Sequence, residues 1–509
     1  MLRFEMRDMN NVFLRILTAR LLLRTTHRNG GTVMLITLIQ KEMMHHLLSA
    51  RFIALLLMCV LLIPLNFHIN YHRYLQRQVD YQETVKDESN KDPAEQPWLR
   101  KQRIDPNLEV SKLILKPTPL SVFGMGLEAA LPSYLGMTRN GIQRGEAALS
   151  TAPLAFLLGH LDFVFVVSAV FSLLALLFTF DAVTGEREAG TLRITLANAL
   201  PRDIFLWSKL IGGYLVFIVP FLVSLIIGLL VLVWQGFPLA EPDIFPRLLY
   251  LMGISLLYIA VFFAIGAVIS IYFDSSKTAL IVAFTVWVFA VLILPRVGFL
   301  AAQTLASTST AESVYREKTA RRAELHATLE AERNKIMGKM IQESKQGEAT
   351  TGFFRLDEAF VAKMNAKMLP LEETARLKYR DLATQLDWRY AQEKKWQDKI
   401  GINLSRVTPT ASFIFLATDA TQTGQVKRDT YFETGTRYYE VLDAEMFSKM
   451  SDAALVETAE IPSPPAPPPL TALTLGEMLQ HAALDLLLLC FFTGGFTSIA
   501  FLKFFRSDI

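Results

Sequence analysis

Charged and small residues that could form a working surface gather in one short segment, 181–209, between two long apolar blocks. The segment begins DAVTGEREAGTLR, so carboxylates stand beside arginines and glycines interrupt them. This spacing favours a compact turn and a short helix, because glycine permits backbone turns that other residues resist. The charges predict ion pairs or a polar docking surface, and a plain connector between two helices is an equally good interpretation.

The rest of the chain offers no pattern that is typical of an enzyme. No G-x-x-x-x-G-K-[ST] phosphate loop, G-x-S-x-G nucleophile elbow or H-E-x-x-H zinc motif occurs in the sequence. The two cysteines, Cys59 and Cys490, lie inside apolar blocks, which favours buried bulk over metal ligands. We therefore expect no catalytic, cofactor-binding or metal-binding residue in this chain.

The composition indicates a membrane protein. The 509 residues are 52% hydrophobic and only 19% charged, and the apolar residues form six blocks without Asp, Glu, Lys or Arg. About 20 apolar residues cross the hydrocarbon as a helix, since lipid offers no partner for free backbone groups. The pattern predicts an all-α integral membrane protein and excludes an ordinary soluble enzyme. The expected transmembrane helices are 52–70, 162–180, 210–234, 248–273, 278–300 and 482–502, with 210–300 holding three of them.

Basic residues predict which side each loop faces. Both termini must share one side, because the number of spans is even. The loop 181–209 carries arginines and a lysine, whereas the short connection after the third span has Glu241 and Asp243 and no basic residue. By the positive-inside rule, the termini and 181–209 are predicted to be cytoplasmic, and 482–509 is predicted to form the last span and its tail. We expect the bilayer to be a plasma (inner) membrane. The net charge of +3 gives no reason to expect a nucleic acid partner.

The N-terminal segment 1–51 is predicted to be cytoplasmic. Residues 1–33 are basic and locally amphipathic, so they either lie on the membrane surface or are a non-native extension that precedes Met34. Residues 34–51 form a second amphipathic run that ends at Arg51. We expect this run to be an interfacial helix that leads into the first span.

Two insertions are predicted to lie outside the membrane. Segment 71–161 begins with helical sequence and then contains KPTPL, whose prolines favour extended chain. Segment 301–481 is the larger module. Its stretches 311–345 and 355–398 are rich in Ala, Glu, Lys and Gln, which predicts a helical hairpin.

Three further features of the larger module can be predicted. The turn of the hairpin is expected at 345–352, and Pro370 is expected to break or kink the second arm. A short aromatic helix is expected around 428–448. The PSPPAPPP run at 462–469 predicts an extended, semi-rigid linker to the last span. Three charged residues at the span edges are interpreted as interface anchors, namely Asp162, Arg296 and Asp485.

The loop 181–209 resembles the same loop in permease subunits of type-2 ATP-binding-cassette (ABC) transporters. The likeness lies in an acidic residue at the end of span two, then Glu-Arg-Glu, then Gly-Thr-Leu, and basic residues that lead into span three. The run 34–51 is similar to that family's interfacial elbow helix. The segments 117–128 and 161–183 resemble the subgroup with large extracytoplasmic insertions.

The resemblance implies that ATP binds to a separate cytoplasmic ABC ATPase subunit, so that no cofactor belongs to this chain. It implies a second permease subunit, identical or related, in the same bilayer. The loop 181–209 would then be the coupling element that docks into the ATPase. The residues that the resemblance assigns to coupling are Asp181, Glu186, Glu188, Gly190, Thr191, Leu192, Arg193, Arg202 and Lys209, the last two near lipid headgroups.

Two other functions stay open at this point. The first is a mechanical or signalling membrane subunit whose outer module acts on an extracytoplasmic partner, and the size of 301–481 supports it. The second is an intramembrane enzyme, which would need paired ionisable residues at matching depth in the spans. The favoured hypothesis is an ABC-type permease, most simply an exporter.

Overall fold

The computed structural model describes residues 30–90, 109–147, 161–197, 200–347, 358–447 and 464–506. Within these residues, six helical segments are long and apolar enough to cross a membrane. The predicted fold class, an all-α membrane protein with six spans, is confirmed. The spans are α3 (Ala50–Ser89), Phe163–Glu188, α11 (Arg202–Trp234), α12 (Ile244–Tyr272), Ser276–Leu305 and α20 (Leu475–Arg506).

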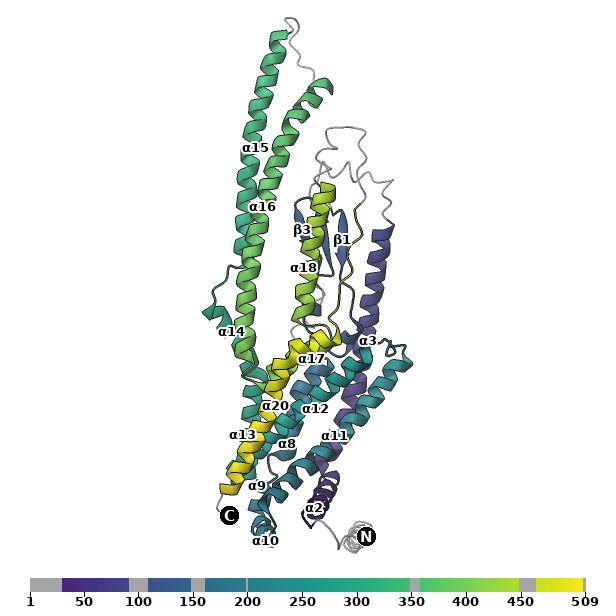
Figure 1. The fold of residues 1–509 in the computed structure, drawn as a ribbon, viewed down its shortest axis with the longest axis vertical. Helices are drawn as coiled ribbons and strands as arrows, with labels where there is room; N and C mark the ends of the chain where they lie inside the picture. Colours follow the sequence, from purple (N-terminus) through teal and green to yellow (C-terminus); the bar gives the residue numbers. More distant parts are fainter. Residues whose placement is uncertain are drawn as a thin grey trace.

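The spans form one bundle with different structures at its two ends (Figure 1). One end carries α2 (Gly30–Leu47), α9 (Thr184–Glu188), α10 (Thr191–Ala197) and the last residues of α20, and we call it the loop end. The opposite end carries a small sheet and two very long helices, and we call it the module end.

The second and fourth spans are the most buried and form the centre of the bundle. The second span consists of α7 (Phe163–Phe165), the π-helical segment η3 (Val166–Phe171), α8 (Ser172–Thr179) and α9. Phe178 in this span packs edge-to-face on Phe217 of α11, with ring centroids 5.4 Å apart. Interlocking aromatic rings of this kind supply van der Waals contact where lipid gives little hydrophobic driving force.

Close approach of helices depends on a glycine in the third span. A Cβ atom at Gly228 of α11 would come within 2.6 Å of the Phe67 ring on α3. Helices α3 and α11 pack along much of their length, and a small residue at this point lets their backbones approach.

The fifth span is continuous but not uniformly α-helical. It consists of α13 (Ser276–Trp287), the π-helical segment η4 (Val288–Ile293) and α14 (Leu294–Leu305). Trp287 Nε1 donates a hydrogen bond of 2.9 Å to Ser172 Oγ, which ties the middle of this span to the second span.

The first insertion contains a three-stranded antiparallel sheet that the sequence analysis did not predict. Strands β1 (Ser111–Ile114), β2 (Tyr134–Thr138) and β3 (Gly141–Arg144) pair in sequence order. The Asn-Gly pair at 140–141 is a strong hairpin signal that could have revealed β2 and β3. Short one-turn helices η1 (Pro119–Val122) and η2 (Glu128–Ala130) connect β1 to β2.

Helix α18 (Gln425–Leu442) of the second insertion covers this sheet. The hydroxyls of Ser111 and Tyr438 lie 2.7 Å apart in a buried contact, and a Cβ at Gly435 would come within 2.5 Å of Leu135. The π-helical segment η5 (Asp443–Phe447) extends α18 over most of the range expected for the aromatic helix, 428–448. The two insertions therefore share one core.

Helices α15 (Ala311–Gly347) and α16 (Glu358–Ser405) lie side by side and form a long arm (Figure 1). Helix α16 continues through Pro370 without a break. The turn predicted at 345–352 falls mostly outside the described residues, as do residues 1–29. Within the Pro-rich linker predicted at 462–469, residues 464–469 have no regular secondary structure, and this continues to residue 474.

Parts of the segment 301–481 pack against the spans. The base of α16 packs on α14, and α17 (Pro409–Ala420) packs between α12 and α20. Phe413 of α17 is fully buried and stacks on Tyr258 near the middle of α12, with ring centroids 4.4 Å apart. The apolar run ASFIFL at 411–416 was the signal for this buried helix, but its neighbouring threonines and proline suggested irregular chain.

Candidate coupling site at the loop end

The loop between the second and third spans is a pair of short helices. Its start is held on the fourth span, because Ser270 Oγ accepts hydrogen bonds from Val183 N (2.8 Å) and Thr184 N (3.2 Å). Gly190 separates α9 from α10 with a φ of +70°, a left-handed conformation that glycine adopts without strain. The turn-and-helix arrangement therefore rests on the identity of Gly190.

Lys209 is the most enclosed basic side chain in the described part of this region. Its side chain is 9% exposed and lies between two carboxylates. Its Nζ donates to Glu42 Oε2 of α2 at 3.0 Å and also to Glu186 of α9. A buried ammonium is tolerated only with such partners, so this triad joins α2, α9 and α11. The predicted contact of Lys209 with lipid headgroups is therefore not found.

Two arginines connect the loop to other span ends. Arg51 of α3 makes a bidentate pair with Asp181, with nitrogen–oxygen distances of 2.8 and 2.7 Å. Arg187 of α9 pairs with Asp274, which precedes the fifth span. Bidentate arginine–carboxylate pairs fix orientation as well as distance.

Glu188 holds the first turn of the fifth span. Its carboxylate accepts hydrogen bonds from Ser276 N (2.9 Å) and Ser276 Oγ (2.6 Å). The first N–H groups of a helix have no partner inside the helix, and a carboxylate there is favourable. Glu188 therefore acts as a cap on α13, supplied from the neighbouring loop.

Leu192 faces inward, whereas its neighbours face solvent. It is 1% exposed and packs in a core with Val183, Phe205 and Phe504. The residues exposed around it form a small surface, which we call the loop tip: Ala189, Gly190, Thr191, Arg193 and Ile194. The large aliphatic side chain of Ile194 is 67% exposed there.

Arg202 is engaged at the start of α11. Its Nη1 donates a hydrogen bond of 3.0 Å to the backbone oxygen of Phe505 near the end of α20. Trp207, just over one turn further along α11, packs against Phe501 of α20, with ring centroids 4.9 Å apart and the ring planes tilted by 44°. The third and sixth spans are thus joined at the loop end.

The sequence-predicted residues fall into two groups. The first group makes the inward contacts that fix the loop to the bundle, and it consists of Asp181, Glu186, Glu188, Leu192, Arg202 and Lys209. The exposed group is Gly190, Thr191 and Arg193.

Sequence reasoning missed the residues that receive these contacts. The missed partners include Glu42, Ser270, Asp274 and Ser276. The acidic Glu42 in an otherwise apolar and basic run was the one available signal. Ser270 lies at the end of the fourth span, and Asp274 and Ser276 lie in the DSSK turn at 274–277. Nothing in the sequence around these three residues indicated that they contact the loop.

The second histidine of α2 lies beside the triad. The ring of His46 stacks on Phe178 at 5.7 Å, and it lies against the position of Gly213. Burial lowers the pKa of His46 below its usual value, because burial disfavours the charged form. His46 is therefore a neutral packing residue at neutral pH.

The comparisons with known proteins identify the family at this point. A model of the family described as ABC-2 family transporter protein matches residues 36–509. The chain belongs to the ABC-2 transporter family. A comparison with curated proteins found no match. The resemblance drawn from the loop 181–209 is thereby confirmed at the level of the family.

The permease therefore carries a loop that is fixed at its base and exposed at its tip. Its inward contacts reach α2, α3, α11, α12 and α13. A force on the loop tip would be distributed to all of these helices, because each contact is an ion pair or a hydrogen bond with good geometry. This arrangement can transmit movement.

Proposed function

We propose that this ABC-2 permease is the membrane subunit of an exporter whose ATP is bound and hydrolysed on a separate ATPase chain docked at the loop tip. The observation that carries the proposal is the division of the loop 181–209 into a tied base and an exposed tip. An apolar Ile194 beside Arg193 suits a protein partner, because interfaces favour arginine and exposed apolar side chains need cover.

The proposed orientation places the loop end in the cytoplasm and the bilayer as an inner membrane. Both described chain ends lie at the loop end (Figure 1). Basic residues concentrate there, whereas the connection between α11 and α12 has only Glu241 and Asp243 as charges. The positive-inside rule favours this orientation. A second permease chain, identical or related, would complete the transporter, and nucleic acid has no role in it.

The experiment compares two double variants of the co-expressed permease and ATPase. Arg193→Glu with Ile194→Glu places two carboxylates on the loop tip and should abolish co-purification of the ATPase. The matched control is Tyr315→Glu with Arg316→Glu, an exposed pair on α15 at the opposite end, which should leave co-purification unchanged. Full recovery of the ATPase with the loop-tip variant would contradict the proposed docking site.

Export, rather than import, is the direction of transport that we propose. The measurement is the direction of ATP-dependent movement in sealed inverted vesicles, where an exporter concentrates its substrate in the lumen.

A further inference from the structure

The fifth span connects the loop end to the arm at the module end. At the loop end, Glu188 caps its first turn at Ser276, and Arg187 pairs with Asp274 just before it. From there α13, η4 and α14 continue without interruption to Leu305. Thirty residues of helix span about 45 Å at 1.5 Å per residue.

The far end of this span is packed tightly on the base of α16. A Cβ atom at Gly298 of α14 would come within 2.7 Å of the backbone nitrogen of Ser405, so the two backbones are in contact. Ser405 Oγ donates a hydrogen bond of 2.9 Å to the oxygen of Pro295. A glycine on α16 makes the matching close contact with α14: a Cβ at Gly401 would lie 2.7 Å from the Phe299 ring. Such mutual contact leaves little freedom for one helix to slide on the other.

The connection from α14 to α15 also stays attached to α16. Gln397 Nε2 donates to the oxygen of Ala306 at 2.8 Å, and Glu393 accepts from Ser309 N at 3.0 Å. Both arms of the hairpin are therefore fixed to the same span. Helix α16 has 48 residues, so a small tilt at its base is enlarged along about 70 Å of helix.

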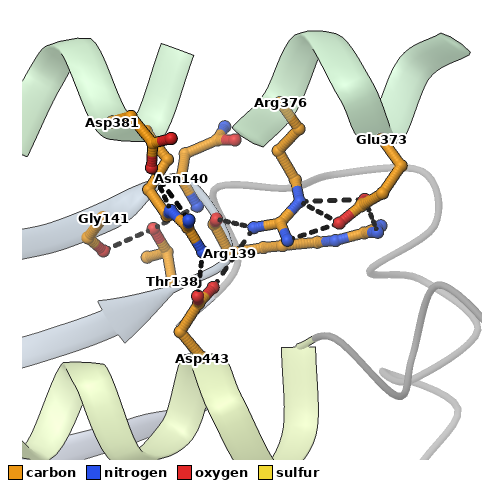
Figure 2. A network of polar contacts seen from close by, with 9 residues as sticks. Thr138, Arg139, Asn140, Gly141, Glu373, Arg376, Asp381 and Asp443 are labelled. Carbon is orange, nitrogen blue, oxygen red and sulfur yellow. Dashed lines mark hydrogen bonds and ion pairs between the residues drawn. The ribbon is translucent and has the colours of Figure 1, made fainter. Parts of the chain in front are cut away.

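The arm is in turn joined to the sheet by a network of charged residues (Figure 2). Arg376 of α16 donates to Glu373 through Nε at 3.0 and 2.9 Å and to the oxygen of Arg139 through Nη1 at 3.2 Å. Arg139, in the β2–β3 turn, reaches Glu373 at 2.8 Å, and Asp443 of η5 pairs with both Arg376 and Arg380. Because these side chains are mostly buried, the sheet and η5 are held to the middle of α16.

One more contact ties the arm to the last span. Arg406, just after α16, makes a bidentate pair with Asp485 of α20 at 2.8 Å for both bonds. Asp485 is 4% exposed, so this charge does not face the headgroups as an anchor would. The base of the arm is thus held on the fifth and sixth spans together.

We propose that the fifth span is a rod that carries movement of the loop 181–209 to the arm α15–α16, so that the permease moves its outer module whenever the bundle changes state. This inference rests on the proposed function, which supplies the force at the loop tip. It assigns to the chain a mechanical output outside the bundle. The charge network then requires that the sheet move with the arm.

The π-helical segment η4 lies in the middle of the rod. A π-helical turn holds an extra residue between hydrogen-bonded groups and is found mostly at functional sites. Coupling between distant sites needs an element with two discrete arrangements. The segment η4 provides the place where the rod can change between a π-helical and an α-helical turn.

The test follows two pairs of spin labels in the assembled permease–ATPase complex, with Cys59→Ala and Cys490→Ala as background. The input pair replaces Trp207 and Lys277 at the loop end. The output pair replaces Trp234 of α11 and Gln385 of α16, both exposed at the other end. Distances are measured without nucleotide and with ATP trapped. We expect both mean distances to shift by more than the width of their distributions.

Gly298→Ala tests the joint between rod and arm, because its methyl group must push α16 away from α14. The variant should keep the shift of the input pair and lose most of the shift of the output pair. The matched control is Gly253→Ala in α12, where a Cβ meets no atom within 4 Å. That control should keep both shifts.

Several outcomes would overturn the inference. In the unsubstituted complex, a shift of the input distance without a shift of the output distance would show that the arm does not follow the bundle. This outcome can be measured whether or not Gly298→Ala folds. A full output shift in a folded Gly298→Ala complex would show that the joint does not carry the movement. If ATP moves neither pair, the proposed function fails and the inference fails with it.

Discussion

At the scale of single residues, Lys209 has the clearest assignment. It is buried between Glu42 and Glu186, and no other basic side chain in the described residues lies within ion-pair distance of these two carboxylates. Removal of the ammonium would leave two enclosed carboxylates facing each other. The structural role of Lys209 can therefore be tested separately from docking.

Lys209→Met should lower the free energy of unfolding by about 3–5 kcal/mol, since breaking a buried ion pair leaves uncompensated charge. Chemical unfolding in detergent measures the change. Arg316→Met, which removes an exposed pair with Glu312, should cost no more than about 1 kcal/mol. A triple variant with Glu42→Leu and Glu186→Leu should recover part of the loss. An unchanged stability for Lys209→Met alone would refute the enclosed triad.

Asp419 offers a prediction with a defined pH dependence. It lies in the last turn of α17, and burial raises its pKa to about 6, with His481 and Arg406 opposing and Asp485 adding to the increase. With a raised pKa, the folded protein binds a proton at Asp419 more tightly than the unfolded chain does. The free energy that this adds to stability is complete at low pH and is lost as the pH rises through about 6.

Asp419→Asn should therefore raise the Tm relative to the unsubstituted protein at pH 8, where the buried carboxylate is charged. The difference should shrink as the pH falls through about 6 and vanish below the ordinary pKa of 3.8. Thermal unfolding at pH 4, 6 and 8, with exposed Glu330→Gln as the control, measures it. A Tm difference that is constant with pH would contradict the buried placement of Asp419.

At the scale of elements, two glycines should respond in opposite ways to the same change. Gly190 has a φ of +70° and Gly338 lies within α15, and a Cβ meets no atom within 4 Å at either position. Only the backbone conformation therefore distinguishes them.

Gly190→Ala should destabilise the protein by about 1–2 kcal/mol, because a Cβ is strained in the left-handed region. Gly338→Ala should stabilise it by about 0.5–1 kcal/mol, because alanine favours helix. Denaturant unfolding of both variants tests the pair. A stabilising Gly190→Ala would show that the α9–α10 turn has another conformation.

The long helices could be predicted from the sequence, and the contacts between insertions could not. Apolar blocks without charge determine the spans, since only a helix satisfies its backbone in lipid. Strands β1–β3 are short and depend on α18, which lies roughly 300 residues away in the sequence. Helix α17 was missed because its burial depends on α12 and α20, and local composition does not reveal such partners.

The loop 181–209 was predictable as a motif but not as a geometry. The Glu-Arg-Glu and Gly-Thr-Leu sequence marked its position. The inward direction of Glu186 and Leu192 depends on Lys209 and on the core under α10, so it emerged only from packing. As a result, the exposed tip is smaller than the set of residues first assigned to docking.

At the scale of the whole molecule, the chain joins a small contact surface at one end to a long arm at the other (Figure 1). Between them lies a bundle whose central spans are packed with phenylalanines. In the described part of the chain, the helices of this bundle connect the loop tip to the module end.

The docking of an ATPase at the loop tip is the central claim, and site-specific photo-crosslinking in intact membranes tests it most directly. A photoreactive residue at Thr191 is predicted to crosslink to an ATP-binding protein, whereas the same residue at Gln385 on the arm is predicted not to do so. A crosslink to that protein from position 385, or only to lipid from position 191, would contradict the account.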